Sequence, residues 1–245
     1  MNKKINKIGG GGKIALSMLL FISVSANVYF CKKEGCWNYM LVKMHIREKK
    51  EIKQYPPDYW AVRGWTSCLQ KMRLKWDVCF YGHSQIEMSD FQKDFPNKKI
   101  IELGYPGDGL DGMIKRVNQI KYTQPNKVFL LAGTNSLWYK KEDFEDKYLR
   151  LVRLIQKENP HSKLYIFSIL PQREGTLGSS RLNAIIKERN SFIGSLCKKN
   201  GIKFFDIYNL YVDVDGNLAE EVTVDGVHLK RNCYGEISKL IKPYI

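Results

Sequence analysis

From residue 75 onward, short apolar runs alternate with stretches of helical periodicity, and this alternation limits the fold more than any other feature of the chain. A short apolar run is typical of a strand buried on both faces, and such strands form parallel sheets covered by helices. The runs fall at residues 78–81, 100–103, 128–131, 164–169 and, more weakly, 204–207. We therefore predict an α/β domain, a three-layer, open parallel sheet of about five strands.

Two long segments between these runs repeat apolar residues at helical spacing. Residues 142–158 carry Phe144, Tyr148, Val152 and Ile155 on one face. Residues 181–199 carry Leu182, Ile185, Ile186, Ile193, Leu196 and Cys197 on one face. A last helix is expected after Asn232. We expect these helices to cover the sheet.

Four short polar stretches carry the residue types of a chemical site. They are Gly82-His83-Ser84, residues 104–108, Gly133-Thr134-Asn135 and residues 225–228. The first three directly follow predicted strands, and ligands of an open parallel sheet bind at the carboxyl ends of its strands. The fourth lies in the loop before the last helix, which can return to the same edge. We therefore predict that the four stretches meet in one site.

An acyl-transfer site needs a nucleophile, a base and a group that orients the base. Ser84 is the candidate nucleophile, His228 the candidate base and Asp225 its orienting carboxylate. Asp225 and His228 are three residues apart, so one loop can present both. His83 is the lesser candidate for the base, because adjacent side chains on a tight turn usually diverge. The alternative interpretation is a plain turn at Asp225-Gly226 with His228 on the surface.

Two further groups are candidates for stabilising an oxyanion. Gly107 lies in a glycine-rich turn, where the absence of side chains can bare its backbone N–H. The side-chain amide of Asn135 would have to point at the same spot. Otherwise residues 133–135 are an ordinary strand-ending turn.

Residues 107–112 also fit the glycine fingerprint of dinucleotide-binding proteins. Asp108 and Asp111 would place negative charge where a pyrophosphate lies, and no acidic residue ends the predicted strand at 128–131 to bind a ribose. A nucleotide-binding protein is therefore the weaker alternative, and no cofactor is expected. The six cysteines contain no Cys-x-x-Cys pair and no histidine at zinc-finger spacing, so no metal site is expected either.

The N-terminal part of the chain is interpreted separately from the domain at residues 75–245. Residues 1–13 are a basic tail, and the apolar run at 14–30 is at the short limit for a membrane span. A cleaved signal peptide stays open, because Val24-Ser25-Ala26 is a passable cleavage site. We favour an uncleaved signal anchor, because a basic juxtamembrane linker follows at 31–74. This predicts a membrane-anchored domain outside the cytoplasm, periplasmic or at the cell surface, and a secreted one if the signal is cleaved.

The formal charge of +15 is concentrated before the domain. Residues 1–76 hold 15 Lys and Arg against 4 Asp and Glu, whereas residues 77–245 hold 25 against 21. A basic stretch beside an apolar one suits an anionic membrane surface. No zinc-finger, RNA-recognition or basic-zipper pattern supports a nucleic-acid partner.

The four polar stretches together resemble the SGNH, or GDSL-like, esterase and acylhydrolase family over about residues 77–242. The matching blocks are residues 77–84 (DVCFYGHS), 104–108 (GYPGD), 133–135 (GTN) and 225–229 (DGVHL), with Leu170-Pro171, Asn183 and Asn190 as further matches. The resemblance implies a flavodoxin-like fold and a triad of Ser84, His228 and Asp225. It also implies an oxyanion hole made of the Ser84 N–H, the Gly107 N–H and the Asn135 side chain.

Three positions depart from the family pattern. His83 and Ser136 stand where the family usually has aspartates, and Cys233-Tyr234 stands where it usually has Gly-Tyr. None of these changes removes a catalytic group. The two lost carboxylates are ones expected to brace the active-site loops.

We therefore expect a serine esterase or acylhydrolase that cleaves an O-acyl group from a small-molecule, glycan or lipid ester. Two other functions stay open. An acyltransferase acting on a cell-envelope glycan would use the same residues, and a catalytically impaired binding module is suggested by His83 and Ser136. Neither the ester nor the oligomeric state follows from the sequence.

Overall fold

The computed structural model describes residues 75–173 and 180–245, which belong to one compact unit, Thr66–Ile245. The predicted basic tail, apolar segment and linker, residues 1–74, lie outside the described residues. Within the described ranges, no helix combines the length and the apolar character that crossing a membrane requires.

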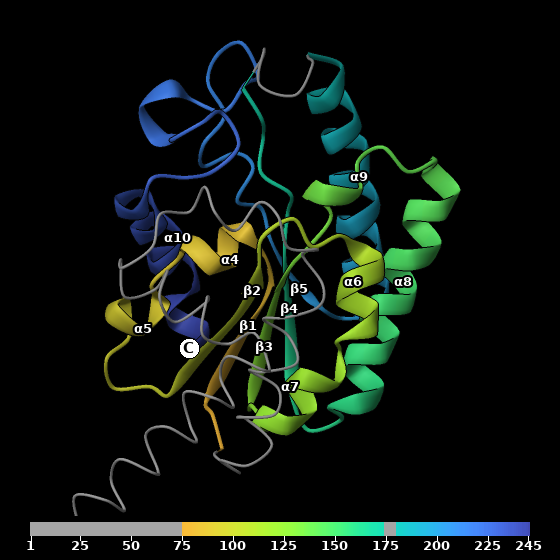
Figure 1. Ribbon diagram of the computed structural model, residues 1–245, viewed down its shortest axis with the longest axis vertical. Coiled ribbons are helices and arrows are strands. Elements are labelled where there is room, and N and C mark those ends of the chain that lie inside the picture. Colours follow the sequence, from red (N-terminus) through yellow and green to blue (C-terminus); the bar gives the residue numbers. More distant parts are fainter. Residues whose placement is uncertain (1–74, 174–179) are drawn as a thin grey trace, which may run out of the picture. The chain divides into compact units, whose positions relative to one another are not determined.

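Five parallel strands form the sheet, and they are β1 (Val78–His83), β2 (Ile100–Tyr105), β3 (Lys127–Leu131), β4 (Lys163–Phe167) and β5 (Lys203–Phe205). Their order is β2-β1-β3-β4-β5, the doubly wound order of flavodoxin-like proteins (Figure 1). The predicted five-stranded parallel sheet is confirmed. Because β1 lies between β2 and β3, the segments that follow these three strands open side by side at one edge of the sheet.

Some strand ends differ from the predicted ones. β1 and β2 continue through Gly82-His83 and Gly104-Tyr105, because these residues still pair with each other across the two strands. β5 ends at Phe205, earlier than predicted. The chain turns away there because the Ser168 hydroxyl oxygen accepts the N–H of Ile207 at 2.8 Å.

Helices cover both faces of the sheet, which confirms the predicted three layers (Figure 1). One face carries α6 (Leu110–Lys115), α7 (Asn118–Thr123), α8 (Lys141–Glu158) and α9 (Ser180–Lys199). The other carries α4 (Ser84–Met88), α5 (Phe91–Asp94) and α10 (Tyr234–Ile241). The helices predicted at 142–158, at 181–199 and after Asn232 are α8, α9 and α10. Short 3₁₀ turns complete the connections: η2 (Thr134–Ser136), η3 (Glu220–Val222), η4 (Arg231–Cys233) and η5 (Lys242–Tyr244).

The strands supply two separate cores, because successive side chains of a strand point to opposite faces. In β1, Cys79 and Tyr81 pack in the cluster beneath α8 and α9, whereas Val78 and Phe80 pack in the cluster beneath α5 and α10. The Phe80 ring stacks on Phe91 of α5 with a centroid distance of 4.0 Å. With both faces buried, the ends of the strands are the part of the sheet where polar groups can gather.

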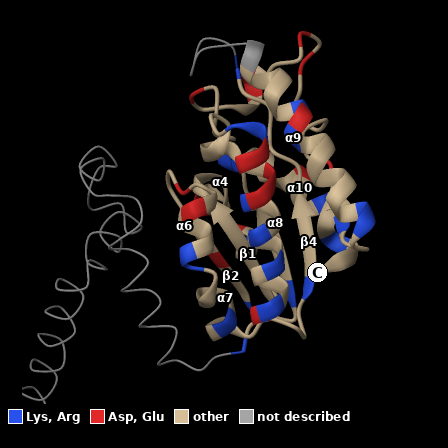
Figure 2. Cartoon of the chain, turned by 90° about the vertical axis from the view of Figure 1, so that its right-hand side faces the viewer, with Lys and Arg blue, Asp and Glu red and all other residues tan. Residues whose placement is uncertain are grey.

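Helix α8 illustrates how the sequence specifies these layers. Phe144, Tyr148, Leu151, Val152 and Ile155 form its buried face. Its first turn is acidic and its last turn basic, which complements the helix dipole. Figure 2 shows basic and acidic segments interspersed along α8 and its neighbours, in line with the near balance of charge after residue 76.

Candidate active site

Ser84 lies at the junction of β1 and α4, where the chain turns with little room for side chains. Gly82 pairs with Gly104 across β1 and β2. A Cβ at Gly82 would lie 2.7 Å from the carbonyl oxygen of Leu131, and a Cβ at Gly104 would clash with the backbone of Glu87 in α4. Helix α4 therefore rests directly on the backbone of the sheet. Ser84, its first residue, is half-buried at the carboxyl edge.

The loop that carries Asp225 and His228 is closed by its own hydrogen bonds. The Thr223 hydroxyl donates to the His228 carbonyl oxygen at 2.8 Å and accepts the Gly226 N–H at 2.8 Å. Thr223 also forms an isolated antiparallel bridge with Leu229. Gly226 has a φ of 83°, which favours glycine. The loop therefore holds the carboxylate and the imidazole in a fixed relation.

The structure brings Ser84, His228 and Asp225 into one chain of hydrogen bonds. Ser84 Oγ lies 2.8 Å from His228 Nε2, and His228 Nδ1 lies 2.7 Å from Asp225 Oδ2. The second carboxylate oxygen, Oδ1, accepts the backbone N–H groups of Val227 at 3.0 Å and His228 at 2.8 Å. With a proton on Nδ1 facing the carboxylate, the neutral imidazole leaves Nε2 free to accept a proton from Ser84.

The ionisation of Asp225 fits this arrangement. Partial burial raises the pKa of the Asp225 carboxyl, but the hydrogen bonds from the backbone and ring of His228 and from the Val227 N–H outweigh it, so the pKa is lowered overall. A charged carboxylate at this position is what orients the imidazole and stabilises an imidazolium.

Gln85, the residue after Ser84, ties the histidine loop to α4. Its side-chain amide donates to the Val227 carbonyl oxygen at 2.6 Å, and its side-chain oxygen accepts the Leu229 N–H at 3.4 Å and the Tyr234 hydroxyl at 2.8 Å. Gln85 is almost fully buried. Gln85 cannot be singled out from the sequence, because its partners are more than 140 positions away and it belongs to no motif.

The two candidate oxyanion donors lie in neighbouring turns. Gly107, with a φ of 75°, lies between β2 and α6, and Asn135 lies in η2 after β3. The Asn135 side-chain amide donates to the Asp108 carbonyl oxygen at 3.0 Å, which joins the two turns. An amide has two N–H donors, so one of these remains for a ligand. Gly133, with a φ of 122°, gives the turn after β3 a conformation that other residues rarely adopt.

Two of the three positions that depart from the family pattern, His83 and Ser136, are buried. Ser136 is fully buried, and its hydroxyl oxygen accepts the N–H of Leu110, the first residue of α6, at 2.9 Å. His83 is 1% exposed, and its Nδ1 accepts the Gln85 N–H at 3.4 Å. Each side chain thus supplies a hydrogen-bond acceptor where a carboxylate was expected.

His83 is electrostatically distinct from His228. Burial, followed by the nearby charges of His228 and Arg116, lowers the pKa of His83 to about 3. Among the residues that the structure describes, its Nε2 atom has no hydrogen-bond partner. His83 is therefore neutral near pH 7, and the serine hydroxyl is hydrogen-bonded to His228 instead.

Asn183 and Asn190 on α9 fasten the segment after β4. Asn190 accepts the Ile169 N–H at 2.7 Å and donates to the Ile169 carbonyl oxygen at 2.9 Å. Asn183 makes the same pair of bonds with Gln172, at 2.9 and 2.7 Å. These asparagines support the edge of the sheet from a neighbouring helix.

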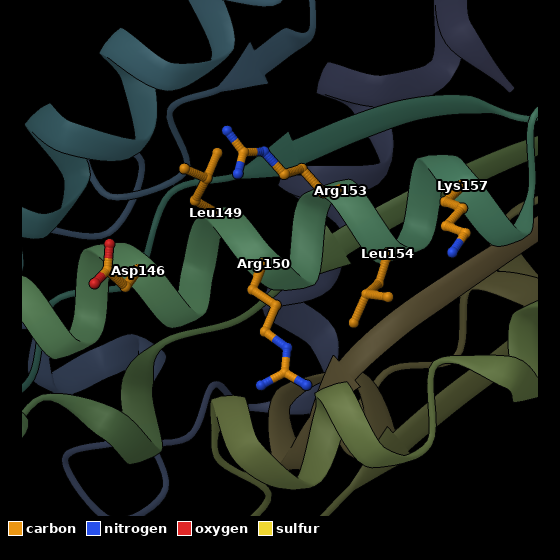
Figure 3. A pocket seen from close by; sticks show the side chains of 6 residues that line it. All are labelled: Asp146, Leu149, Arg150, Arg153, Leu154 and Lys157. Carbon is orange, nitrogen blue, oxygen red and sulfur yellow. The ribbon is translucent and has the colours of Figure 1, made fainter.

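A surface hollow of about 400 Å³ lies along α8, apart from the polar stretches. Its lining is Asp146, Leu149, Arg150, Arg153, Leu154 and Lys157, all on that helix (Figure 3). None of these residues belongs to the serine, glycine, asparagine or histidine blocks, so the hollow is not the candidate site.

The chain is similar in sequence to proteins that are named for different activities. An N-acylneuraminate cytidylyltransferase of Escherichia coli O18:K1:H7 is 28% identical over 177 residues, covering 68% of this chain and 40% of that protein. The chain thus spans less than half the length of that relative. The platelet-activating factor acetylhydrolase IB subunit alpha2 of Gallus gallus is 23% identical over 169 residues, covering 66% of this chain and 73% of that protein.

Solved structures share the fold. A GDSL-like lipase from Bacteroides thetaiotaomicron superposes with a TM-score of 0.61 and 23% identity, covering 71% of this chain and 88% of that one. An acetyl xylan esterase superposes with a TM-score of 0.57 and 21% identity, covering 69% of this chain and 100% of that one.

A family model for the GDSL-like lipase/acylhydrolase family matches residues 64–234, which is well over half of the chain and includes all four polar stretches. This protein therefore belongs to the GDSL-like lipase/acylhydrolase family.

Proposed function

We propose that this protein is a serine esterase that removes an O-acyl group from a glycan or a lipid, with Ser84, His228 and Asp225 as its triad. The observation that carries the proposal is the chain of hydrogen bonds from Ser84 Oγ through His228 to Asp225, with distances of 2.8 and 2.7 Å. Nucleophile, base and orienting carboxylate are thus within hydrogen-bond reach of one another before substrate binds.

The reaction proceeds in two halves. Ser84 Oγ attacks the ester carbonyl carbon while its proton passes to His228 Nε2, and the imidazolium that forms is stabilised by Asp225. The tetrahedral intermediate collapses to an acyl-serine, and the leaving alkoxide takes the proton from His228. Water then attacks the acyl-serine with His228 again as base, which releases the carboxylic acid and restores Ser84.

The oxyanion of each tetrahedral intermediate would be held by the N–H groups of Ser84 and Gly107 and by the Asn135 side chain. Two observations support this. Ser84 is the first residue of a helix, so its N–H has no partner within that helix. Asn135 is already oriented through its bond to the Asp108 carbonyl oxygen, so no reorganisation of the amide is needed as charge develops.

The substrate class is supported by an exposed tryptophan and by the relatives. Trp138 is 72% exposed, and it lies three residues after Asn135 at the same edge of the sheet. Its neighbours hold the loop, because Leu137 is buried and the Tyr139 hydroxyl donates to Asp111 at 2.9 Å. An exposed indole on a loop held by its neighbours offers a surface for a sugar ring or an acyl chain. The acetylhydrolase and acetyl xylan esterase among the comparisons make acetyl esters of lipids and glycans the first substrates to test.

We also propose that residues 14–30 anchor the protein and that the domain works outside the cytoplasm. The proposal rests on the basic tail before that apolar run and on the concentration of positive charge ahead of the domain. A reporter that is active only after export, fused after Ile245, tests the topology and should be active. A high-salt wash of the membrane fraction tests the anchor and should leave the protein in the membrane. A silent reporter would contradict the topology, and release by salt would contradict the anchor.

Labelling by a fluorophosphonate probe tests the central proposal. The full chain in detergent should be labelled, and Ser84→Ala should not be. Ser191→Ala, which removes an exposed hydroxyl from α9, is the matched control and should be labelled like the wild type. Equal labelling of Ser84→Ala would overturn the assignment of the nucleophile. Incubation of the unlabelled wild-type enzyme with an acyl donor and a glycan acceptor then distinguishes hydrolysis, which releases the free acid, from transfer, which acylates the glycan.

A further inference from the structure

We infer that Arg116, a residue outside the triad and the oxyanion hole, is a positioning residue that fixes the oxyanion turn against the nucleophile strand. The oxyanion turn is defined as residues 105–109, from the last residue of β2 to the residue before α6. The inference rests on the proposed function of Ser84, Gly107 and Asn135.

The guanidinium of Arg116 joins three segments of the carboxyl edge. It lies at the end of α6 and is 4% exposed. Its Nε donates to Asp108 Oδ2 in the oxyanion turn at 2.6 Å. Its terminal nitrogens donate to the carbonyl oxygens of Gly82 in β1 at 2.7 Å and of Leu103 in β2 at 3.1 Å. The acceptor in β1 is two residues before Ser84.

Two aromatic rings hold the plane of this guanidinium. Its central carbon lies 4.3 Å from the ring centroid of Tyr81 and 4.3 Å from that of Tyr105. Tyr81 belongs to β1 and Tyr105 is the last residue of β2, so the same two strands that accept the hydrogen bonds also supply the rings. Cation–π contacts with two rings leave the fork few other orientations.

Asp108 transmits this position to both proposed oxyanion donors. Its carboxylate is held by Arg116, its carbonyl oxygen accepts the Asn135 amide at 3.0 Å, and Gly107 directly precedes it in the chain. The carboxylate fills the space beside Gly112, where any Cβ would collide with it. The glycine spacing that fits a dinucleotide fingerprint therefore makes room for an internal carboxylate at this position.

Arg116 stays protonated and positively charged. Burial lowers the pKa of the guanidinium, but the neighbouring Tyr81, Asp108 and Tyr105 raise it, so that it stays above its ordinary value. The ion pair with Asp108 is buried on both sides, with side-chain exposures of 3% and 5%. Lysine would keep the charge without the planar fork, so Arg116→Lys tests geometry with the charge retained.

The experiment compares Arg116→Lys with wild type in the hydrolysis of p-nitrophenyl acetate by the full chain. We expect kcat to fall by about 10- to 100-fold with KM little changed, because displacing an oxyanion donor weakens mainly the transition state. Asp108→Asn, which keeps the shape of the side chain, should lower kcat in the same way and serves if Arg116→Lys does not fold. Lys121→Gln is the matched control, because it breaks an exposed ion pair between α7 and Glu158 of α8, and its kcat should match wild type.

A second comparison separates positioning from general destabilisation. Leu151→Ala removes a buried side chain of α8 and should lower Tm without changing kcat at a temperature where the protein is folded. An Arg116→Lys protein that is folded and keeps wild-type kcat would overturn the inference, as would an equal loss of kcat in Leu151→Ala.

Amide hydrogen exchange distinguishes failure of this inference from failure of the proposed function. We expect residues 105–110 to exchange at least tenfold faster in Arg116→Lys or Asp108→Asn than in wild type. Unchanged protection there would overturn the inference even in an active enzyme. A wild-type chain that no fluorophosphonate labels would overturn the proposed function, and faster exchange in the variants would still support the role of Arg116 in holding the turn.

Discussion

Replacing His83 with asparagine is expected to reduce the loss of stability in acid. Burial, His228 and Arg116 lower the pKa of His83 to about 3, whereas an unfolded histidine titrates near about 6.5. Between these values the unfolded state binds a proton that the folded state does not, so the folded state loses stability as the pH falls below about 6.5. The contribution of neutral His83 to the free energy of unfolding is fully present above that pH and declines steadily down to about pH 3.

The magnitude follows from the distance between the working pH and the unfolded pKa. At about pH 5 the gap is about 1.5 units, and each unit corresponds to about 1.4 kcal/mol, so His83 accounts for a loss of about 2 kcal/mol relative to about pH 7. Asparagine keeps a hydrogen-bond acceptor near the position of Nδ1 but does not titrate. The variant can be less stable at neutral pH and still show the shallower dependence on pH.

Urea unfolding of wild type and His83→Asn across this pH range measures the difference in slope. Groups whose pKa is also shifted, such as Asp111 and Asp225, contribute to both proteins and cancel in the comparison. His161→Asn, at an exposed position, controls for the loss of a histidine as such. If wild type and His83→Asn lose the same free energy of unfolding between about pH 7 and about pH 5, then His83 is not held neutral in the folded protein.

Three further predictions concern catalysis. His228→Ala and Asp225→Asn should each lower kcat by about 10⁴-fold in steady-state ester hydrolysis, because each disrupts transfer of the serine proton. A fully active His228→Ala would show that another group is the base. Asn135→Ala should lower kcat by about 10²- to 10³-fold with little change in KM, and a pure KM effect would instead indicate ground-state binding. Trp138→Ala should raise KM for acetylated glycans or lipids by about fivefold, which is equivalent to about 1 kcal/mol of stacking, and should leave the kinetics with p-nitrophenyl acetate unchanged. An equal effect on both substrates would refute direct contact between Trp138 and the larger substrate.

The sheet and its helices could be predicted from local patterns in the sequence. Apolar runs mark strands whose two faces are both buried, and apolar residues at helical spacing mark α8 and α9. The exact strand ends could not be predicted, because they depend on pairing between strands. Gly82 and Gly104 end their apolar runs in the sequence but lie opposite each other within the sheet.

The residues that support the site were harder to predict than those proposed to react. Ser84, Asp225 and His228 belong to short motifs with a chemical signature. Arg116 is indistinguishable in sequence from a solvent-exposed arginine at a helix end, although its partners in β1 and β2 make it buried. From the sequence, the negative charge of Asp108 is expected to repel a phosphate, whereas in the structure that charge is paired internally with Arg116.

The hydrogen bond between Ser84 and His228 spans 144 positions of the sequence. A ribosome therefore completes almost the entire domain before the proposed base is available to the proposed nucleophile. Any chain that stops before His228 retains Ser84 but lacks the side chain that is proposed to accept its proton. In the proposed mechanism, esterase activity thus requires synthesis through His228, and two separately expressed fragments divided in a surface loop should be inactive alone and regain activity only on reassembly.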